Sequence, residues 1–110
     1  MAPKTVSRFD IWWANLDPTI GHEIRKTGPV LIISPDELNR HLGTVLVAPL
    51  TSTIRPYPFR VHTVVSDIPG QLALDQIRAL DKARLIRRMG VLPQKTRREI
   101  VSVLQLMFAE

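Results

Sequence analysis

The stretch GHEIRKTGPVLIIS (residues 21–34) joins a charged segment directly to an apolar one. Its second half, Val30–Ser34, is a short continuous apolar run, which predicts a strand buried on both faces. Its first half carries four charged or titratable side chains, at His22, Glu23, Arg25 and Lys26. Polar groups in a loop beside a rigid strand often line a site. The stretch therefore predicts a core strand, and the loop before it is a candidate site.

The rest of the chain alternates short apolar runs with turns marked by proline and glycine, which is typical of an antiparallel β domain. Further strands are predicted at 10–16, 44–50, 59–65, 71–74 and 76–80. Single helical turns are predicted at 35–40 and 82–85, a loop at 51–58 and a turn at 67–70. Many short strands and tight turns favour a curled or barrel-like sheet.

The clearest helix lies at the C-terminus. Thr96 and Glu99 have the spacing of a capping box, which predicts where the helix begins. An apolar face follows at helical spacing, formed by Ile100, Val103, Leu104 and Met107. Apolar residues continue on other sides of the helix, so we expect it to pack between its own sheet and a second subunit.

Composition narrows the possible classes. The 110 residues suit a single domain, with residues 1–7 as a loose N-terminal arm. Cysteine is absent, so no disulfide or thiolate chemistry is expected. No secretory leader pattern or membrane-length apolar run is visible, and a cytoplasmic protein without a membrane partner is expected. The net charge of +5 makes a polyanion such as nucleic acid a candidate partner, although a modest surplus is also common on ordinary surfaces.

Three segments carry candidate chemistry. The loop 17–28 places a histidine beside a carboxylate and two cations, which can bind phosphate and move protons, or is simply a solvated charged loop. The segment 51–55 offers hydroxyls and a cation to an oxyanion, or is an ordinary turn. In the third segment, Asp75 and Gln76 are predicted on opposite faces of a strand. No metal-ligand spacing or phosphate-binding glycine loop occurs, so neither a metal nor a cofactor is expected.

Six motifs, in this order, carry a resemblance to a known family. They are DIW (10–12), LDPTIGHE (16–23), PVLIIS (29–34), VAPLTS (47–52), YPF (57–59) and LDQIRALDKARL (74–85). Together they cover nearly the whole chain and resemble the MazF/PemK (Kid) toxins of type II toxin–antitoxin systems. The resemblance implies a curled, SH3-like antiparallel barrel of the CcdB/MazF type with a C-terminal helix, and a homodimer.

The resemblance also implies an activity. Members of this family are metal-independent endoribonucleases that cut single-stranded RNA, including mRNA, at a short sequence. The ribose 2′-hydroxyl attacks the adjacent phosphorus and leaves a 2′,3′-cyclic phosphate and a 5′-hydroxyl. A MazE/PemI-like antitoxin neutralises the toxin by covering the RNA groove, and any contact with DNA is expected only through that antitoxin.

Site residues follow from the resemblance position by position. Glu23 is a candidate base or orienting carboxylate, and Asp75 matches a carboxylate proposed as base. Thr51 matches the threonine whose hydroxyl stabilises the phosphoryl oxygens. The expected RNA-binding residues are His22, Arg25, Lys26, Ser52, Arg55, Gln76 and Arg78.

Two positions depart from the family. Gly28 stands where the family normally has arginine, its main cationic catalytic group, so we expect a weakened or inactive enzyme. Arg25 and Lys26 are near in sequence but would have to reach back along the loop, so we do not expect either to replace it. Phe9 stands where the family usually has glycine.

Three other functions stay open at this stage. An inactive toxin-like dimer that binds RNA or antitoxin without cutting is favoured by Gly28. A gyrase poison of the CcdB kind shares the expected fold. An SH3-like adaptor would need an aromatic-lined groove, which an aromatic content of 5% disfavours.

Overall fold

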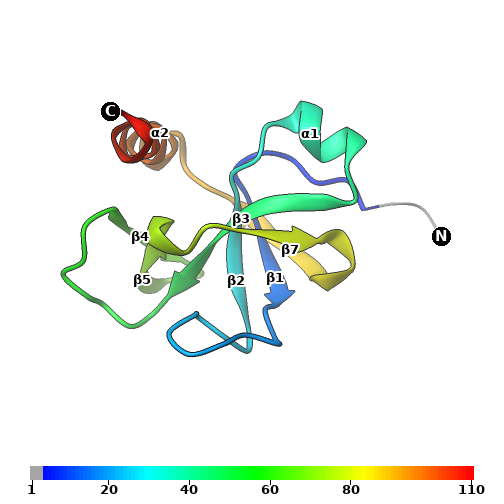
Figure 1. Cartoon of the computed structure of the whole chain (residues 1–110), viewed down its shortest axis with the longest axis horizontal. Coiled ribbons are helices and arrows are strands. Elements are labelled where there is room, and N and C mark those ends of the chain that lie inside the picture. The colour runs from blue at the N-terminus through cyan, green and yellow to red at the C-terminus, as the bar shows by residue number, and fades with distance from the viewer. Residues whose placement is uncertain (1–3) are drawn as a thin grey trace.

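The computed structural model describes residues 4–110, which form an antiparallel sheet with a C-terminal helix (Figure 1). In chain order the elements of this part are β1 (Asp10–Asn15), β2 (Thr27–Ile32), α1 (Asp36–His41), β3 (Thr44–Thr51), β4 (Arg60–Val65), β5 (Ile68–Ala73), the 3₁₀ turn η1 (Leu74–Gln76), β6 (Arg78–Asp81), the 3₁₀ turn η2 (Lys82–Arg84), β7 (Leu85–Val91) and α2 (Gln94–Phe108). The strand order is β4-β5-β3-β2-β1-β7, with β6 also paired to β3. This is the mainly β fold that the sequence predicts.

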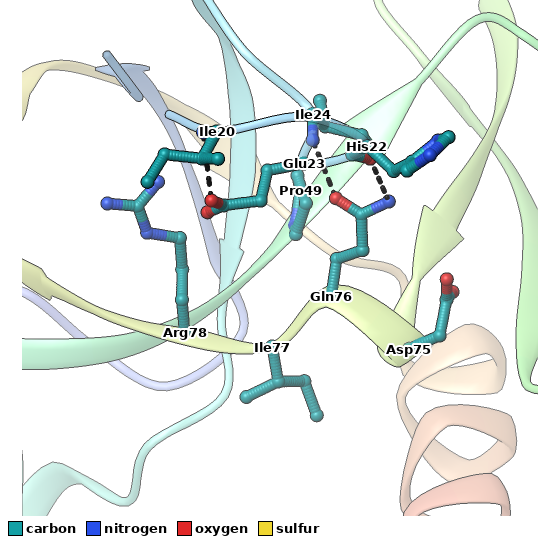
Figure 2. A pocket seen from close by; sticks show the side chains of 9 residues that line it. All are labelled: Ile20, His22, Glu23, Ile24, Pro49, Asp75, Gln76, Ile77 and Arg78. Carbon is teal, nitrogen blue, oxygen red and sulfur yellow. Dashed lines mark hydrogen bonds between the residues drawn. The ribbon is translucent and has the colours of Figure 1, made fainter. Parts of the chain in front are cut away.

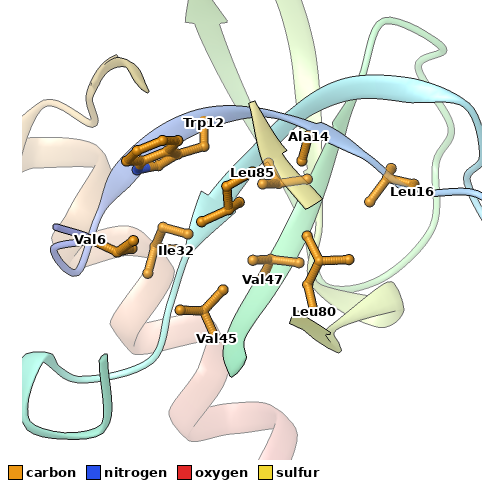
Figure 3. Close-up of a cluster of buried hydrophobic side chains, with 10 residues drawn as sticks. Val6, Trp12, Ala14, Leu16, Ile32, Val45, Val47, Leu80 and Leu85 are labelled. Atoms are coloured by element: carbon orange, nitrogen blue, oxygen red, sulfur yellow. The ribbon is translucent and has the colours of Figure 1, made fainter. Parts of the chain in front are cut away.

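The apolar run from Val30 to Ile33 is buried on both faces, as predicted, but the strand β2 spans Thr27–Ile32 and not the predicted Val30–Ser34. Val30 and Ile32 point into one core cluster, which also holds Trp12 of β1 (Figure 3). Leu31 and Ile33 point into a second cluster, where they meet Ile100 of α2. Each side chain alternates to the opposite face, so this one strand joins the two halves of the core.

Strand β3 changes partner along its length, and this change curls the sheet. Its first residues, 44–47, pair with β6, whereas Leu50 and Thr51 pair with β5. Pro49 lies between these two segments and pairs with neither β6 nor β5. Its missing N–H therefore removes no hydrogen bond to either of these strands. The change of partner brings η1, which links β5 to β6, next to the loops that precede β2 and follow β3.

Several sequence predictions differ from the structure. Residues 86–91 received no element but belong to β7, an outer strand with mostly exposed side chains and therefore a weak hydrophobic pattern. The helix α2 begins at Gln94 after Pro93, and no side chain caps it, so the predicted capping box is wrong. The turn between β4 and β5 is at Ser66 and Asp67 and not at the predicted residues 67–70. The positive φ angles of these two residues, 52° and 63°, are those of a type I′ turn.

The expected loose N-terminal arm is wrong for residues 4–7, and residues 1–3 lie outside the described part. Val6 is only 6% exposed and joins the cluster around Trp12. The Lys4 ammonium donates to the backbone carbonyls of Lys82 and Leu85. Within residues 4–110 no helix is long and apolar enough to cross a membrane.

Candidate active site

Three adjoining hollows lie along the edge formed by the loops 16–26 and 52–59 and by η1. The Glu23 hollow is shown in Figure 2 and is lined by Ile20, His22, Glu23, Ile24, Pro49, Asp75, Gln76, Ile77 and Arg78. The Tyr57 hollow shares several of these residues and adds Thr51, Thr53, Arg55, Tyr57 and Arg60. The Gly28 hollow includes Arg25, Gly28, Thr51 and Ser52. Of the eleven site residues predicted from the sequence, all except Lys26 line at least one hollow.

Glu23 closes a tight turn in the loop before β2. Its Oε1 accepts a hydrogen bond from the Ile20 backbone N–H at 2.9 Å, and the Glu23 N–H donates back to the Ile20 carbonyl at 3.2 Å. The second carboxylate oxygen has no hydrogen-bond partner among residues 4–110 and faces the Glu23 hollow (Figure 2). The free oxygen of Glu23 can therefore accept a proton, or a hydrogen bond from a hydroxyl group, while Oε1 keeps its bond to the Ile20 N–H.

Gln76 holds that loop against η1. Its Oε1 accepts from the Ile24 N–H at 2.6 Å, and its Nε2 donates to the His22 carbonyl at 3.3 Å (Figure 2). Both ends of the amide are thus used to fix the loop that carries His22 and Glu23. The predicted placement of Asp75 and Gln76 on opposite faces of a strand is wrong, because both lie in the 3₁₀ turn η1.

Asp75 is held by an arginine that sequence reasoning missed. Arg60 of β4 donates from Nε to Asp75 Oδ1 at 2.6 Å and from Nη2 to Oδ2 at 3.1 Å. The Arg60 side chain is 5% exposed, whereas that of Asp75 is 34% exposed. The carboxylate is therefore fixed from the protein side while it stays open to the hollows. Nothing in the sequence pairs these two residues, which are 15 positions apart.

A buried glutamine holds the loop after β3. Gln71 is 1% exposed, and its amide pairs with both backbone groups of Arg55, accepting from N–H at 3.0 Å and donating to C=O at 2.9 Å. Gln71 Oε1 also accepts from Arg60 Nη1 at 3.4 Å. The ring of Tyr57 lies 5.0 Å from the Arg60 guanidinium. A polar residue at the start of the predicted strand 71–74, directly before an apolar run, is the sequence signal that could have identified Gln71.

The Gly28 hollow contains hydroxyl groups and has space for a side chain at position 28. Thr51 Oγ1 accepts from the Thr53 N–H at 3.1 Å, which leaves its own O–H free to donate to an anion. Ser52 lies beside it on the rim. A Cβ built on Gly28 would meet nothing within 4 Å, and the φ angle of Gly28 is not positive. Neither packing nor backbone conformation therefore requires glycine at position 28.

The other predicted residues differ in how they are engaged. Arg78 Nη1 donates to the Leu16 carbonyl at 3.0 Å, which connects β6 to the start of the loop before β2. Trp12 is buried, whereas Trp13 lines the Gly28 hollow, as the alternation of a strand predicts. Lys26 has a positive φ angle of 71°, and its backbone is bonded to Leu16 and Asp17. Its side chain lines none of the three hollows.

Phe9 also has a backbone conformation that favours glycine. Its φ angle is 70°, and the centroid of its ring lies 5.1 Å from Arg8 Cζ and 5.6 Å from Arg97 Cζ. This is the position where the resemblance leads us to expect glycine. In the part of the chain that the structure describes, no three His, Cys, Asp or Glu side chains lie close enough together to hold a metal ion.

Comparisons with known proteins agree with this arrangement. A model of the PemK-like, MazF-like toxins of type II toxin–antitoxin systems matches residues 7–108. Endoribonuclease EndoA of Bacillus subtilis is 30% identical over 110 residues, covering 94% of this chain and 95% of that protein. The crystal structure of MazF from Deinococcus radiodurans superposes with a TM-score of 0.83 at 26% identity, covering 94% of this chain and 96% of that one.

A second similar structure is a mycobacterial endoribonuclease in complex with its cognate antitoxin. It superposes with a TM-score of 0.79 at 27% identity and covers 96% of this chain and 98% of that one. The family model spans almost the entire chain, and the curled sheet is the one seen in these structures. The chain therefore belongs to the PemK-like, MazF-like toxin family of type II toxin–antitoxin systems.

Proposed function

We propose that this chain is the toxin of a type II toxin–antitoxin system and a metal-independent endoribonuclease that cleaves single-stranded RNA at a specific sequence. The observation that carries the proposal is a groove formed by the adjoining Glu23 and Tyr57 hollows, in a chain whose family consists of such toxins. Asp75 lines both hollows, Glu23 lines the first and Thr51 the second. Its relative from Bacillus subtilis is named an endoribonuclease. The net charge of +5 suits a polyanionic substrate.

The reaction is an internal transesterification. The 2′-oxygen forms a bond to phosphorus while the bond from phosphorus to the 5′-oxygen breaks, which gives a 2′,3′-cyclic phosphate and a 5′-hydroxyl. The 2′-hydroxyl loses a proton and the 5′-oxygen gains one, so no water, metal or oxidant is consumed. Glu23 or Asp75 takes the first proton, and the Thr51 hydroxyl donates to a phosphoryl oxygen as negative charge grows there. DNA lacks the attacking hydroxyl and is not cut.

The rate in this chain is reduced by Gly28. Removal of one donor to a developing oxyanion commonly costs about 10²–10³ in rate. Glycine supplies neither a charge nor a proton, so the phosphoryl charge is less well stabilised than the family's arginine would achieve. RNA binding is less affected, because the groove offers many contacts.

The partners follow from the family and from exposed apolar residues. The related mycobacterial endoribonuclease forms a complex with a cognate antitoxin, and we propose that a MazE/PemI-like antitoxin neutralises this chain in the same groove. We also propose a homodimer. Large apolar side chains are exposed on β4, β5, β7 and α2, at Val64, Ile68, Val91, Leu106 and Phe108.

The test compares the natural chain with Gly28→Arg on a long single-stranded RNA in the presence of EDTA. We expect both to cut at the same short sequence and leave 5′-hydroxyl ends, with Gly28→Arg faster by about 10²-fold. A DNA strand of the same sequence is the control and should stay intact. If neither protein cuts but both bind RNA, the chain is a non-cleaving binder. If neither cuts nor binds RNA, gyrase-dependent DNA breakage becomes the next assay.

A further inference from the structure

Gly28 supplies no cation, but Arg25 lines the same hollow. The Gly28 hollow has a volume of about 360 Å³, and Arg25 is the only charged residue that lines it among those the structure describes. The rest of its wall is made of hydroxyl side chains, including Thr51 and Ser52, the indole of Trp13 and apolar side chains. A space with hydroxyl donors, one guanidinium and no carboxylate suits a phosphate group.

Backbone geometry explains why Arg25 and Gly28 share this hollow. Along a regular strand, positions 25 and 28 would face opposite sides, because side chains alternate with a period of two. Lys26, between them, has a φ angle of 71°, which is outside the strand conformation and breaks the alternation. The expectation that Arg25 would have to reach back along the loop is therefore not met, since it already lines the space that a side chain at position 28 would enter.

The backbone on each side of Arg25 is fixed. The Ile24 N–H donates to Gln76 Oε1 at 2.6 Å, and the Lys26 N–H donates to Asp17 Oδ1 at 3.1 Å. The Lys26 carbonyl also accepts from the Leu16 N–H at 2.9 Å. The loop therefore presents Arg25 from a defined position, which reduces the entropy lost when its side chain binds a phosphate.

Neighbouring arginines are already occupied. Arg60 binds Asp75, and Arg78 and Arg84 donate to backbone carbonyls of residues 16 and 17. The Arg25 guanidinium has neither a hydrogen bond nor an ion pair with any residue in the described range 4–110. Arg55 is also uncommitted through its side chain, but it lines the Tyr57 hollow and not the Gly28 hollow.

We propose that Arg25 supplies the catalytic cation of this chain, donating its N–H groups to a non-bridging oxygen of the scissile phosphate in place of an arginine at position 28. Arg25 stays protonated throughout, and the bonds formed and broken are those of the transesterification above. The inference rests on the proposed function. It predicts that the residual activity of the natural chain depends on Arg25.

The test measures kcat and KM for RNA cleavage in EDTA with the unsubstituted 110-residue chain, Arg25→Ala, Gly28→Arg and the double variant. Arg25→Ala should lower kcat by about 10²-fold or more, and Gly28→Arg should restore the activity of Arg25→Ala. The control is Arg40→Ala, which removes the same charge from an exposed position on α1 outside the three hollows and should change kcat by less than about twofold. Thermal unfolding of each variant checks that it is folded.

The outcomes separate the two proposals. If Arg25→Ala and Arg40→Ala behave alike while the natural chain cuts, the role of Arg25 is overturned and the ribonuclease proposal stands. If the unsubstituted chain is inactive and only Gly28→Arg cuts, the role of Arg25 is also overturned and the ribonuclease proposal stands. If Gly28→Arg and the natural chain both fail to cut, the ribonuclease proposal fails, and the role of Arg25 fails with it.

Discussion

The Arg60 guanidinium donates hydrogen bonds to both oxygens of the Asp75 carboxylate, with Nε 2.6 Å from Oδ1 and Nη2 3.1 Å from Oδ2. Arg60 comes from β4 and Asp75 from η1, so the pair ties the turn after β5 to the neighbouring strand. A two-point ion pair fixes direction as well as distance. Asp75 thus enters the groove as an oriented carboxylate, and Arg60 acts as its positioning residue.

Replacing Arg60 by lysine tests this relationship. Lysine keeps the charge but cannot hold two oxygens at once, so we expect the Asp75 carboxylate to shift and kcat to fall by about 10–100-fold. KM should change much less, because the net charge of the groove is kept. Arg60→Lys is introduced into the Gly28→Arg variant, and Gly28→Arg alone is the reference. Steady-state RNA cleavage by both proteins gives kcat and KM.

Asp75→Asn in the same background is the matched control. If Arg60 acts through Asp75, adding Arg60→Lys to Asp75→Asn should cost little more than Asp75→Asn alone. Fully additive losses would show instead that Arg60 acts on RNA independently of Asp75.

Gln71→Leu is expected to loosen the loop at residues 52–59. The buried amide satisfies both backbone groups of Arg55, and leucine satisfies neither. We expect the free energy of unfolding to fall by about 1–3 kcal/mol, measured by denaturant titration at one fixed protein concentration. Hydrogen exchange at the Arg55 amide should become faster.

Gln71→Glu is the control for that loop, because it keeps the acceptor for the Arg55 N–H. Its Arg55 amide should remain protected while that of Gln71→Leu does not. Equal exchange rates in the two variants and the natural chain would mean that other contacts hold the loop.

The apolar run Val30–Ile33 was sufficient to predict a central strand. In a small β domain such a run is stable only when both of its faces are buried, as they are here. Local pattern was not sufficient for β7, whose exposed side chains follow no hydrophobic period. Among the residues that line the hollows, those in recognisable motifs, such as Glu23, could be predicted from the sequence. Arg60 and Gln71 were missed, because their roles depend on which strands become neighbours, and a single sequence does not record that pairing.

Phe9 offers a test of backbone strain against side-chain packing. Its φ angle of 70° disfavours every residue with a Cβ, while its ring packs beside Arg8 and Arg97. Comparing Phe9→Gly with Phe9→Ala separates the two effects, since both lose the ring. We expect Phe9→Gly to be the more stable by about 1 kcal/mol in denaturant unfolding. At an ordinary strand position the order would be reversed, and that order would contradict a strained Phe9.

Two strand glycines should respond oppositely to the same substitution. A Cβ on Gly70 of β5 would lie 2.7 Å from the carbonyl oxygen of Thr51, whereas one on Gly28 would meet nothing within 4 Å. We expect Gly70→Ala to lower the free energy of unfolding by about 1–3 kcal/mol, because β3 and β5 must separate to admit the methyl group. Gly28→Ala should change it by no more than about 0.5 kcal/mol.

Gly70→Ala should also slow RNA cleavage, because the strand it displaces carries the Thr51 hydroxyl at its end. Denaturant unfolding and cleavage rates are measured on the two alanine variants side by side. Equal stability of the two variants would show that the contact between Gly70 and the Thr51 carbonyl does not set the spacing of these strands.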